Sequence, residues 1–201
     1  MTNRIMQVLS LVLLMFAAAV PARAQAADPA AAAVQNFYDA LVASMKSGGT
    51  AKSRYEKLRP AVEQSFDLAG MTALSVGPSW SSMAPADQKA LTEAFERMTI
   101  ANYASNFDSF SGEKFTVDPT VTERGGNKFV KSTLKPASGA AIPFNYRVHD
   151  AGGSWKIVDV YLNGNISQLA QKRSDFGATL QTSGPAGLAK KINALADKTL
   201  G

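Results

Sequence analysis

The residues with the most obvious capacity for chemistry gather around the only histidine, His149, which is followed closely by Asp150 and Ser154. A Ser-His-Asp arrangement would activate the serine hydroxyl as a nucleophile. However, the run Asp150-Ala-Gly-Gly153 has the small residues of a hairpin loop, where these side chains would face solvent. Ser154 also lacks the G-x-S-x-G elbow of serine hydrolases. We therefore expect no catalytic residue here.

Asp159 is a second candidate, because it interrupts the apolar segment 155–162. A carboxylate in an apolar pocket can act as a general base. The alternative is structural: Asp159 accepts hydrogen bonds from backbone NH groups, or pairs with Arg147 or Arg173. We favour the structural role, which predicts that Asp159→Asn lowers stability and removes no activity.

Composition excludes several other functions. The chain has no cysteine, so disulfides and thiolate metal sites are impossible. One histidine and dispersed carboxylates make no metal site, and no phosphate-binding or dinucleotide motif is present, so we expect neither metal nor cofactor. The net charge of +5 is too small and scattered to indicate nucleic-acid binding. Four basic residues do cluster, and we interpret them as a solvated helix face, with an anionic-lipid or partner patch as the alternative: Lys52, Arg54, Lys57 and Arg59.

The N-terminus resembles a secretory signal peptide. Arg4 precedes the apolar run 5–20, and Ala22-Arg23-Ala24 is a small-x-small cleavage site. A membrane anchor is the alternative, but the apolar run is shorter than the roughly 20 residues that span a bilayer. We expect a signal peptide at 1–24 and one soluble domain at 25–201 outside the cytoplasm. Loss of Arg4 and Arg23 would lower the net charge from +5 to +3.

Hydrophobic periodicity predicts an α+β fold. Three- and four-residue spacing predicts helices at 29–46, 52–64, 66–76 and 85–110, with Asp67 as an N-cap and Pro60 as a candidate break. Strands follow at 113–122, 127–135, 141–150 and 154–162, and then helices at 166–180 and 185–200. Short loops favour an antiparallel meander. We therefore expect a curved four-stranded antiparallel sheet packed against several helices.

The last two predicted strands carry much apolar surface. Strict alternation would place Trp155, Ile157 and Tyr161 on one face of the final strand, and Val158, Val160 and Leu162 on the other. Both faces must therefore be covered, either by protein or by the contents of a cavity.

Several motifs carry a resemblance to a known family. They are the run Trp155–Val160, Gly164 and Arg173-Ser-Asp-Phe176, preceded by Phe66–Met71, Gly77–Trp80 and Phe95–Phe107. Together these segments resemble the MlaC, or toluene-tolerance, family of periplasmic lipid-binding proteins, over roughly residues 66–187. Lys172 stands where many members have a tyrosine. This departure, together with Ser167–Ala170, favours the hopanoid-associated branch of the family.

The resemblance implies a monomeric periplasmic shuttle without enzymatic activity. It would carry phospholipid, or a hopanoid, between an outer-membrane lipoprotein complex and an inner-membrane ABC complex with an MCE-type ring. The lipid tails would occupy a hydrophobic cavity between sheet and helices. The candidate lining residues are Met71, Leu74, Trp80, Met98, Tyr103, Phe107, Val130, Tyr146, Val148, Val158, Val160 and Phe176.

Two other classes of function remain open from the sequence. One is a small α+β isomerase or hydrolase that uses Asp159 in the same pocket. The other is a non-binding envelope adaptor with a solid core, in which Trp at Val158 or Val160 would unfold the protein.

Overall fold

The computed structural model describes residues 27–201. The expected signal peptide at 1–24 therefore lies outside the described residues. Between residues 27 and 201, no helix combines the length and the hydrophobicity that crossing a bilayer requires.

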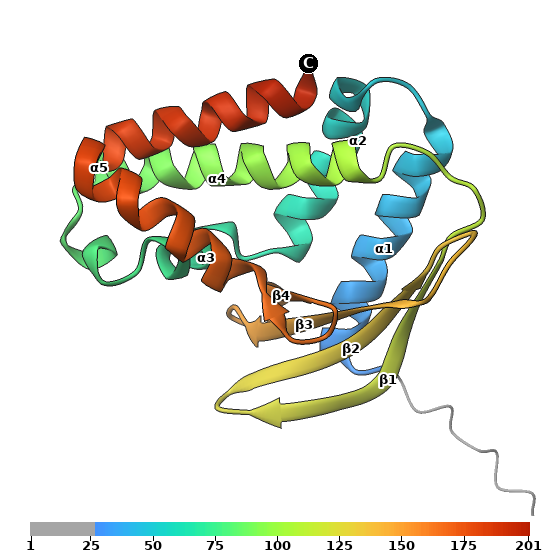
Figure 1. The fold of residues 1–201 in the computed structure, drawn as a ribbon. Helices are drawn as coiled ribbons and strands as arrows, with labels where there is room; N and C mark the ends of the chain where they lie inside the picture. Colours follow the sequence, from blue (N-terminus) through green and yellow to red (C-terminus); the bar gives the residue numbers. More distant parts are fainter. Residues whose placement is uncertain (1–26) are drawn as a thin grey trace, which may run out of the picture.

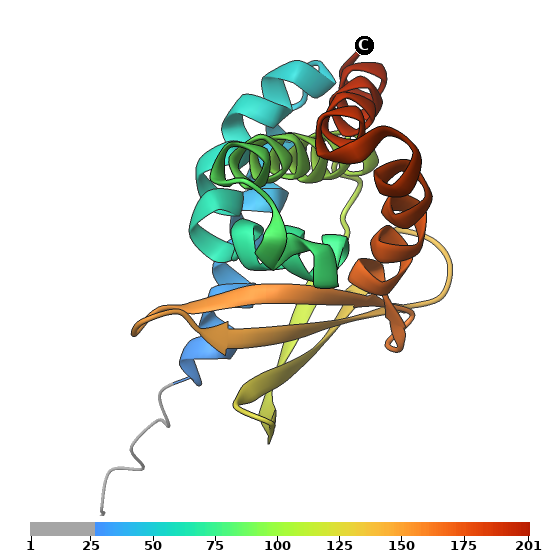
Figure 2. The same ribbon diagram turned by 90° about the vertical axis from the view of Figure 1, so that its left-hand side faces the viewer.

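Helices form one layer of the described protein and a five-stranded antiparallel sheet forms the other (Figures 1 and 2). The strand order β1-β2-β3-β4-β5 confirms the predicted meander, and the fold class is α+β as expected. The fifth strand, which has only two residues, was not predicted. The elements are α1 (Pro29–Ser47), α2 (Ala51–Ser65), α3 (Leu68–Val76), the 3₁₀ helix η1 (Pro78–Ser82), α4 (Pro85–Asn106), β1 (Lys114–Arg124), β2 (Asn127–Lys135), β3 (Ile142–Asp150), β4 (Trp155–Leu162), β5 (Ile166–Ser167) and α5 (Gln168–Leu200).

Helices α1, α2, α3 and α5 each begin after a residue whose side chain caps the first turn, whereas α4 begins at Pro85 without a side-chain cap. Asp28 caps α1 by accepting a hydrogen bond from Ala30 N at 2.8 Å, and Asp67 caps α3 as predicted. Helix α2 continues through Pro60, although a proline inside a helix removes one backbone hydrogen bond. Leu58 and Val62 on either side are fully buried, and this packing outweighs the local cost.

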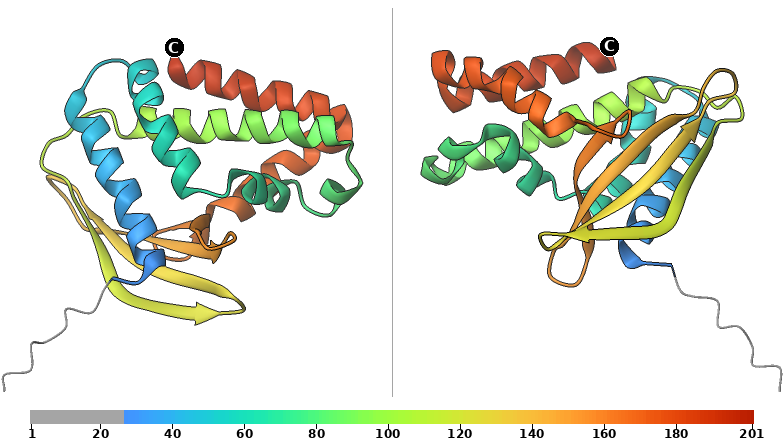
Figure 3. Two further views of the ribbon diagram at one scale, coloured as in Figure 1. Left: turned by 180° about the vertical axis from the view of Figure 1, so that it is seen from behind. Right: turned by 60° about the horizontal axis from the view of Figure 1, so that its bottom comes forward.

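Helices cover one face of the sheet, and the other face is turned away from them (Figure 3). On the covered face, Val130 of β2 pairs with Tyr146 of β3, and both belong to the hydrophobic core. The two segments predicted as separate C-terminal helices form one element, α5, which bends at Gly184 with a φ of 62°. The part of α5 beyond this bend packs along α4 (Figure 1).

Strand β4 contains a β-bulge that the sequence did not reveal. The adjacent residues Arg147 and Val148 of β3 pair with Asp159 and Ile157, which leaves Val158 as an extra residue between them. A bulge reverses the alternation of side chains beyond it. The predicted division of β4 into two faces was therefore wrong.

Beyond the bulge, Val160 lies opposite Tyr146 on the helix-covered face and belongs to the core. Tyr161 lies on the other face, where its ring packs 6.4 Å from that of Phe129. The bulge thus turns Val160 toward the helices on the same side as Ile157.

Candidate functional site

An apolar cavity of about 300 Å³ lies between the helix layer and the sheet. Its walls are formed by Phe66 and helix α3, by helix α4, by strands β3 and β4, and by the start of α5. The hydrophobic lining residues are Phe66, Met71, Phe95, Met98, Tyr103, Phe107, Phe144, Val160, Leu162 and Leu169. A lining of this kind suits hydrocarbon, because each CH₂ group moved from water into it gains roughly 0.8 kcal/mol.

Helix α4 supplies one long wall of this cavity. Phe95, Met98, Tyr103 and Phe107 recur at the spacing that brings side chains to one helix face. Met98 and Phe95 are each 2% exposed, so this face is packed against the rest of the protein. Burial raises the pKa of the Tyr103 hydroxyl well above its ordinary value, so this ring stays neutral in the wall.

The start of α5 is fixed by a tight turn after β4. Asn163 and Gly164 both adopt positive φ, and the side-chain amide of Asn145 donates a 2.9 Å hydrogen bond to the Gly164 carbonyl. Ser167 then caps the helix by accepting a hydrogen bond from Ala170 N at 3.0 Å. This turn directs the first residues of α5 toward the cavity.

Asp159 holds the same turn in place. Its carboxylate is 3% exposed and accepts hydrogen bonds from Ser167 Oγ at 2.7 Å, Val160 N at 2.8 Å and Leu169 N at 3.3 Å. Among residues 27–201 it forms no ion pair with an arginine. The backbone-bonding alternative is therefore the one observed, and Asp159 does not line the cavity in which a general base would act.

The residues around His149 do not form a catalytic arrangement. Asp150 and Ser154 are exposed, as predicted, and Asp150 accepts a hydrogen bond from Gly153 N at 2.6 Å within the hairpin loop. His149 departs from the expectation of full exposure, because its Nε2 lies 3.0 Å from Asp67 Oδ2 at the start of α3. Within 27–201, no group of three or more histidine, aspartate or glutamate side chains could hold a metal ion.

The predicted basic cluster is only partly solvated. Lys52, Lys57 and Arg59 are exposed, but Arg54 is 5% exposed and turns inward. Its Nε donates to the Ala104 carbonyl at 2.8 Å, so Arg54 ties α2 to the end of α4.

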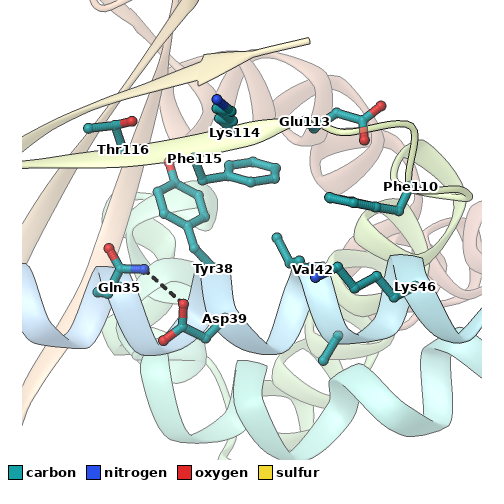
Figure 4. A pocket seen from close by; sticks show the side chains of 11 residues that line it. Gln35, Tyr38, Asp39, Val42, Lys46, Phe110, Glu113, Lys114, Phe115 and Thr116 are labelled. Carbon is teal, nitrogen blue, oxygen red and sulfur yellow. Dashed lines mark hydrogen bonds between the residues drawn. The ribbon is translucent and has the colours of Figure 1, made fainter. Parts of the chain in front are cut away.

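A second hollow, an open groove of about 540 Å³, lies between α1 and β1 (Figure 4). Tyr38 and Phe115 project toward each other across it, while Gln35 donates a hydrogen bond to Asp39 on the helix side. Its lining mixes apolar and charged side chains, so it is less suited to hydrocarbon than the cavity.

A row of aromatic rings leads from the groove to the cavity. The ring centroids of Tyr38 and Phe115 lie 4.6 Å apart, those of Phe115 and Phe107 5.9 Å, and those of Phe107 and Tyr103 6.1 Å. Tyr38 and Phe115 line the groove, whereas Phe107 and Tyr103 line the cavity. The two hollows therefore lie at opposite ends of this row, and the contact between Phe115 and Phe107 joins them.

The structure gathers five of the twelve predicted lining residues around the cavity: Met71, Met98, Tyr103, Phe107 and Val160. Four others, Val130, Tyr146, Val148 and Phe176, lie in the packed core. Val158 is the bulged residue. Leu74, which is 44% exposed, and Trp80 line a shallow hollow on the surface, so neither faces the cavity.

The polar residues of the cavity were missed by sequence reasoning. Thr99, Asn102 and Asn106 come from α4, and Gln168 and Lys172 come from α5. Polar residues on a helix normally indicate its solvent-facing side, so their periodicity alone could not assign them to a cavity. Lys172 was noted in the sequence only as a departure from a motif.

Two motifs of the resemblance meet in space. Gly77 has a φ of +83°, which favours glycine, and a Cβ atom there would lie 2.9 Å from the Nε of Arg173. The same Arg173 lies beside Trp80 in the shallow surface hollow. The glycine after α3 and the arginine of α5 are therefore parts of one contact between these helices.

Fold and site define an α+β protein with an apolar cavity between its helices and one face of an antiparallel sheet. Residues 32–194 of this chain match the protein family that is described as MlaC protein. The toluene tolerance protein ttg2D of Pseudomonas putida is 26% identical over 179 residues, which cover 86% of this chain and 82% of the relative.

A solved structure has the same fold. It is that of a phospholipid-binding protein from Ralstonia solanacearum in complex with a phospholipid, with a TM-score of 0.74 and 19% identity. The similarity covers 86% of this chain and 99% of that one. The chain belongs to the MlaC family.

Proposed function

We propose that this protein binds phospholipid by enclosing acyl-chain hydrocarbon in the cavity between α4 and the sheet. The single observation that carries this proposal is the cavity itself, with ten hydrophobic residues among its fifteen lining residues. Membership of the MlaC family and the phospholipid-bound relative from Ralstonia solanacearum support it.

The volume indicates how the chains would be accommodated. If a CH₂ group takes about the 30 Å³ that a water molecule takes in the liquid, a cavity of about 300 Å³ holds roughly ten such groups. One ordinary acyl chain is longer than this. We therefore expect the Phe107 and Phe115 rings to separate on loading, so that the chain continues into the groove between α1 and β1.

The protein would act as a carrier and not as an enzyme. The cavity presents no nucleophile paired with a base, and Asp159 is engaged in the turn that begins α5. Binding and release of an unchanged lipid require no cofactor. In this proposal the monomeric protein works in the periplasm, where it moves lipid between an inner-membrane ABC complex with an MCE-type ring and an outer-membrane lipoprotein complex.

Uptake of lipid from membranes tests this proposal. Protein stripped of lipid would be incubated with phospholipid vesicles, separated from them, and extracted with organic solvent. We expect about one phospholipid per protein. Protein that emerges folded and without lipid would contradict the proposal.

A further inference from the structure

The polar residues of the cavity lie on two helices. On α4, Asn102 and Asn106 are four residues apart and therefore on the same side of the helix. On α5, Gln168 and Lys172 have the same spacing. On the side of the sheet, in contrast, the lining residues are Phe144, Val160 and Leu162. The cavity is thus apolar along the sheet and carries polar groups on both helices.

Lys172 is the only lysine, arginine, aspartate or glutamate among the described residues that line this cavity. Its side chain is half-buried, and it forms no ion pair with any of residues 27–201. An ammonium group without an ionic partner on the wall of an apolar space favours an anion beside it, because a charge-assisted hydrogen bond is stronger than a neutral one.

Neighbouring amides would assist such an anion. No hydrogen bond within 27–201 engages the side chains of Asn102 and Asn106, so their NH₂ groups are available as donors. The Gln168 amide donates only a long 3.3 Å bond to the Ile166 carbonyl. One cation and several amide donors thus border a space whose remaining walls are hydrocarbon.

We infer that Lys172 recognises the phosphate of the bound lipid, so that the cavity selects anionic phospholipids over uncharged lipids of equal hydrocarbon content. This inference rests on the proposed function and extends it to a specificity. A hopanoid without an anionic group would leave Lys172 unpaired. Lys172 therefore favours phospholipid as the cargo. In the sequence analysis the same residue had favoured the hopanoid-associated branch of the family.

The experiment compares two probes with identical acyl chains, phosphatidylglycerol and diacylglycerol, in competition for delipidated mature protein exported from a Gram-negative host. Native mass spectrometry measures the ratio of the two complexes. One charge-assisted contact at a partly exposed site predicts about a tenfold preference for phosphatidylglycerol. Lys172→Gln should reduce this preference to less than about twofold, and Lys172→Arg should keep it.

Lys190→Gln is the matched control, because Lys190 is an exposed lysine of α5 that does not line the cavity. It should behave as the wild type does. Equal uptake of both probes by the wild type, or an unchanged preference in Lys172→Gln, would overturn the inference while leaving lipid binding intact. Uptake of neither probe by folded wild-type protein would overturn the proposed function together with the inference.

Discussion

Replacing Val160 with tryptophan distinguishes a protein that contains a lipid cavity from a protein with a solid core. Val160 lines the cavity, whereas Val148 on the neighbouring strand is fully buried and does not. The indole at position 160 can therefore occupy the cavity, and we expect Val160→Trp to change the free energy of unfolding by less than about 1 kcal/mol. Val148→Trp must displace packed neighbours, and we expect a loss of about 3 kcal/mol or more.

The same substitution should abolish lipid uptake. Tryptophan adds about seven heavy atoms to valine, so it would displace about as many CH₂ groups of the ligand, worth roughly 5 kcal/mol of binding free energy. Even if adjustment of the protein and the lipid recovers half of this binding free energy, the affinity for lipid would fall by about 50-fold or more. Urea unfolding measures stability, and lipid taken up from vesicles measures binding.

Two results would refute this reasoning. If Val160→Trp unfolds as readily as Val148→Trp, the space beside Val160 cannot accept a side chain and the adaptor hypothesis gains support. If Val160→Trp is stable and still takes up lipid as the wild type does, the lipid binds elsewhere.

Three further predictions concern residues that hold the fold and the cavity together. Asp159→Asn replaces a carboxylate that accepts three hydrogen bonds, so urea unfolding should show a loss of about 2 kcal/mol while lipid uptake by the folded protein is retained. Lost uptake without lost stability would instead favour a functional role for this carboxylate. Burial raises the pKa of Tyr103, so above about pH 10 the unfolded state releases this proton and the folded state keeps it. The free energy of unfolding must then fall as the pH rises, and the Tyr103 proton accounts for about 1.4 kcal/mol of that fall between about pH 9 and pH 11. Tyr103→Phe should therefore reduce the fall that urea unfolding measures across this whole range by about 1.4 kcal/mol, and an unchanged fall would contradict the burial of this hydroxyl. Arg54→Ala should cost about 3 kcal/mol in the same assay, because it leaves the Ala104 carbonyl without its buried donor, whereas Lys57→Ala on the exposed side of α2 should cost less than about 0.5 kcal/mol. Similar losses for the two variants would contradict the assignment of Arg54 to the interior.

The parts of the fold that were predicted correctly have strong local signals. Asp67 precedes an apolar helical segment and caps it, and Gly125-Gly126 separates two runs with strand periodicity. The two helices predicted at 166–180 and 185–200 lie on either side of the bend at Gly184, but their union into one element, α5, was not predicted.

The bulge at Val158 explains why part of the site was missed. Valine is compatible with either face of a strand and with a bulge, so no local preference distinguishes these positions. Strict alternation of side chains therefore placed Val160 and Ile157 on opposite faces of the strand, whereas both face the helices.

Cavity and core were indistinguishable in the sequence for a related reason. Leu74 and Met71 are both apolar residues of α3, yet Leu74 is 44% exposed and Met71 lines the cavity. Only the placement of α4 and α5 around α3 decides between them. The polar lining residue Lys172 depends in the same way on the direction in which α5 leaves the sheet.

The most direct test of the central claim is the mass of the native protein. The mature protein, exported in a Gram-negative host, would be purified without detergent and examined by native mass spectrometry, followed by analysis of an organic extract. We predict a stoichiometric mass increment that resolves into phospholipids in the wild type and is absent from Val160→Trp. A folded wild-type protein that carries no lipid, and acquires none when phospholipid vesicles are offered, would contradict the account.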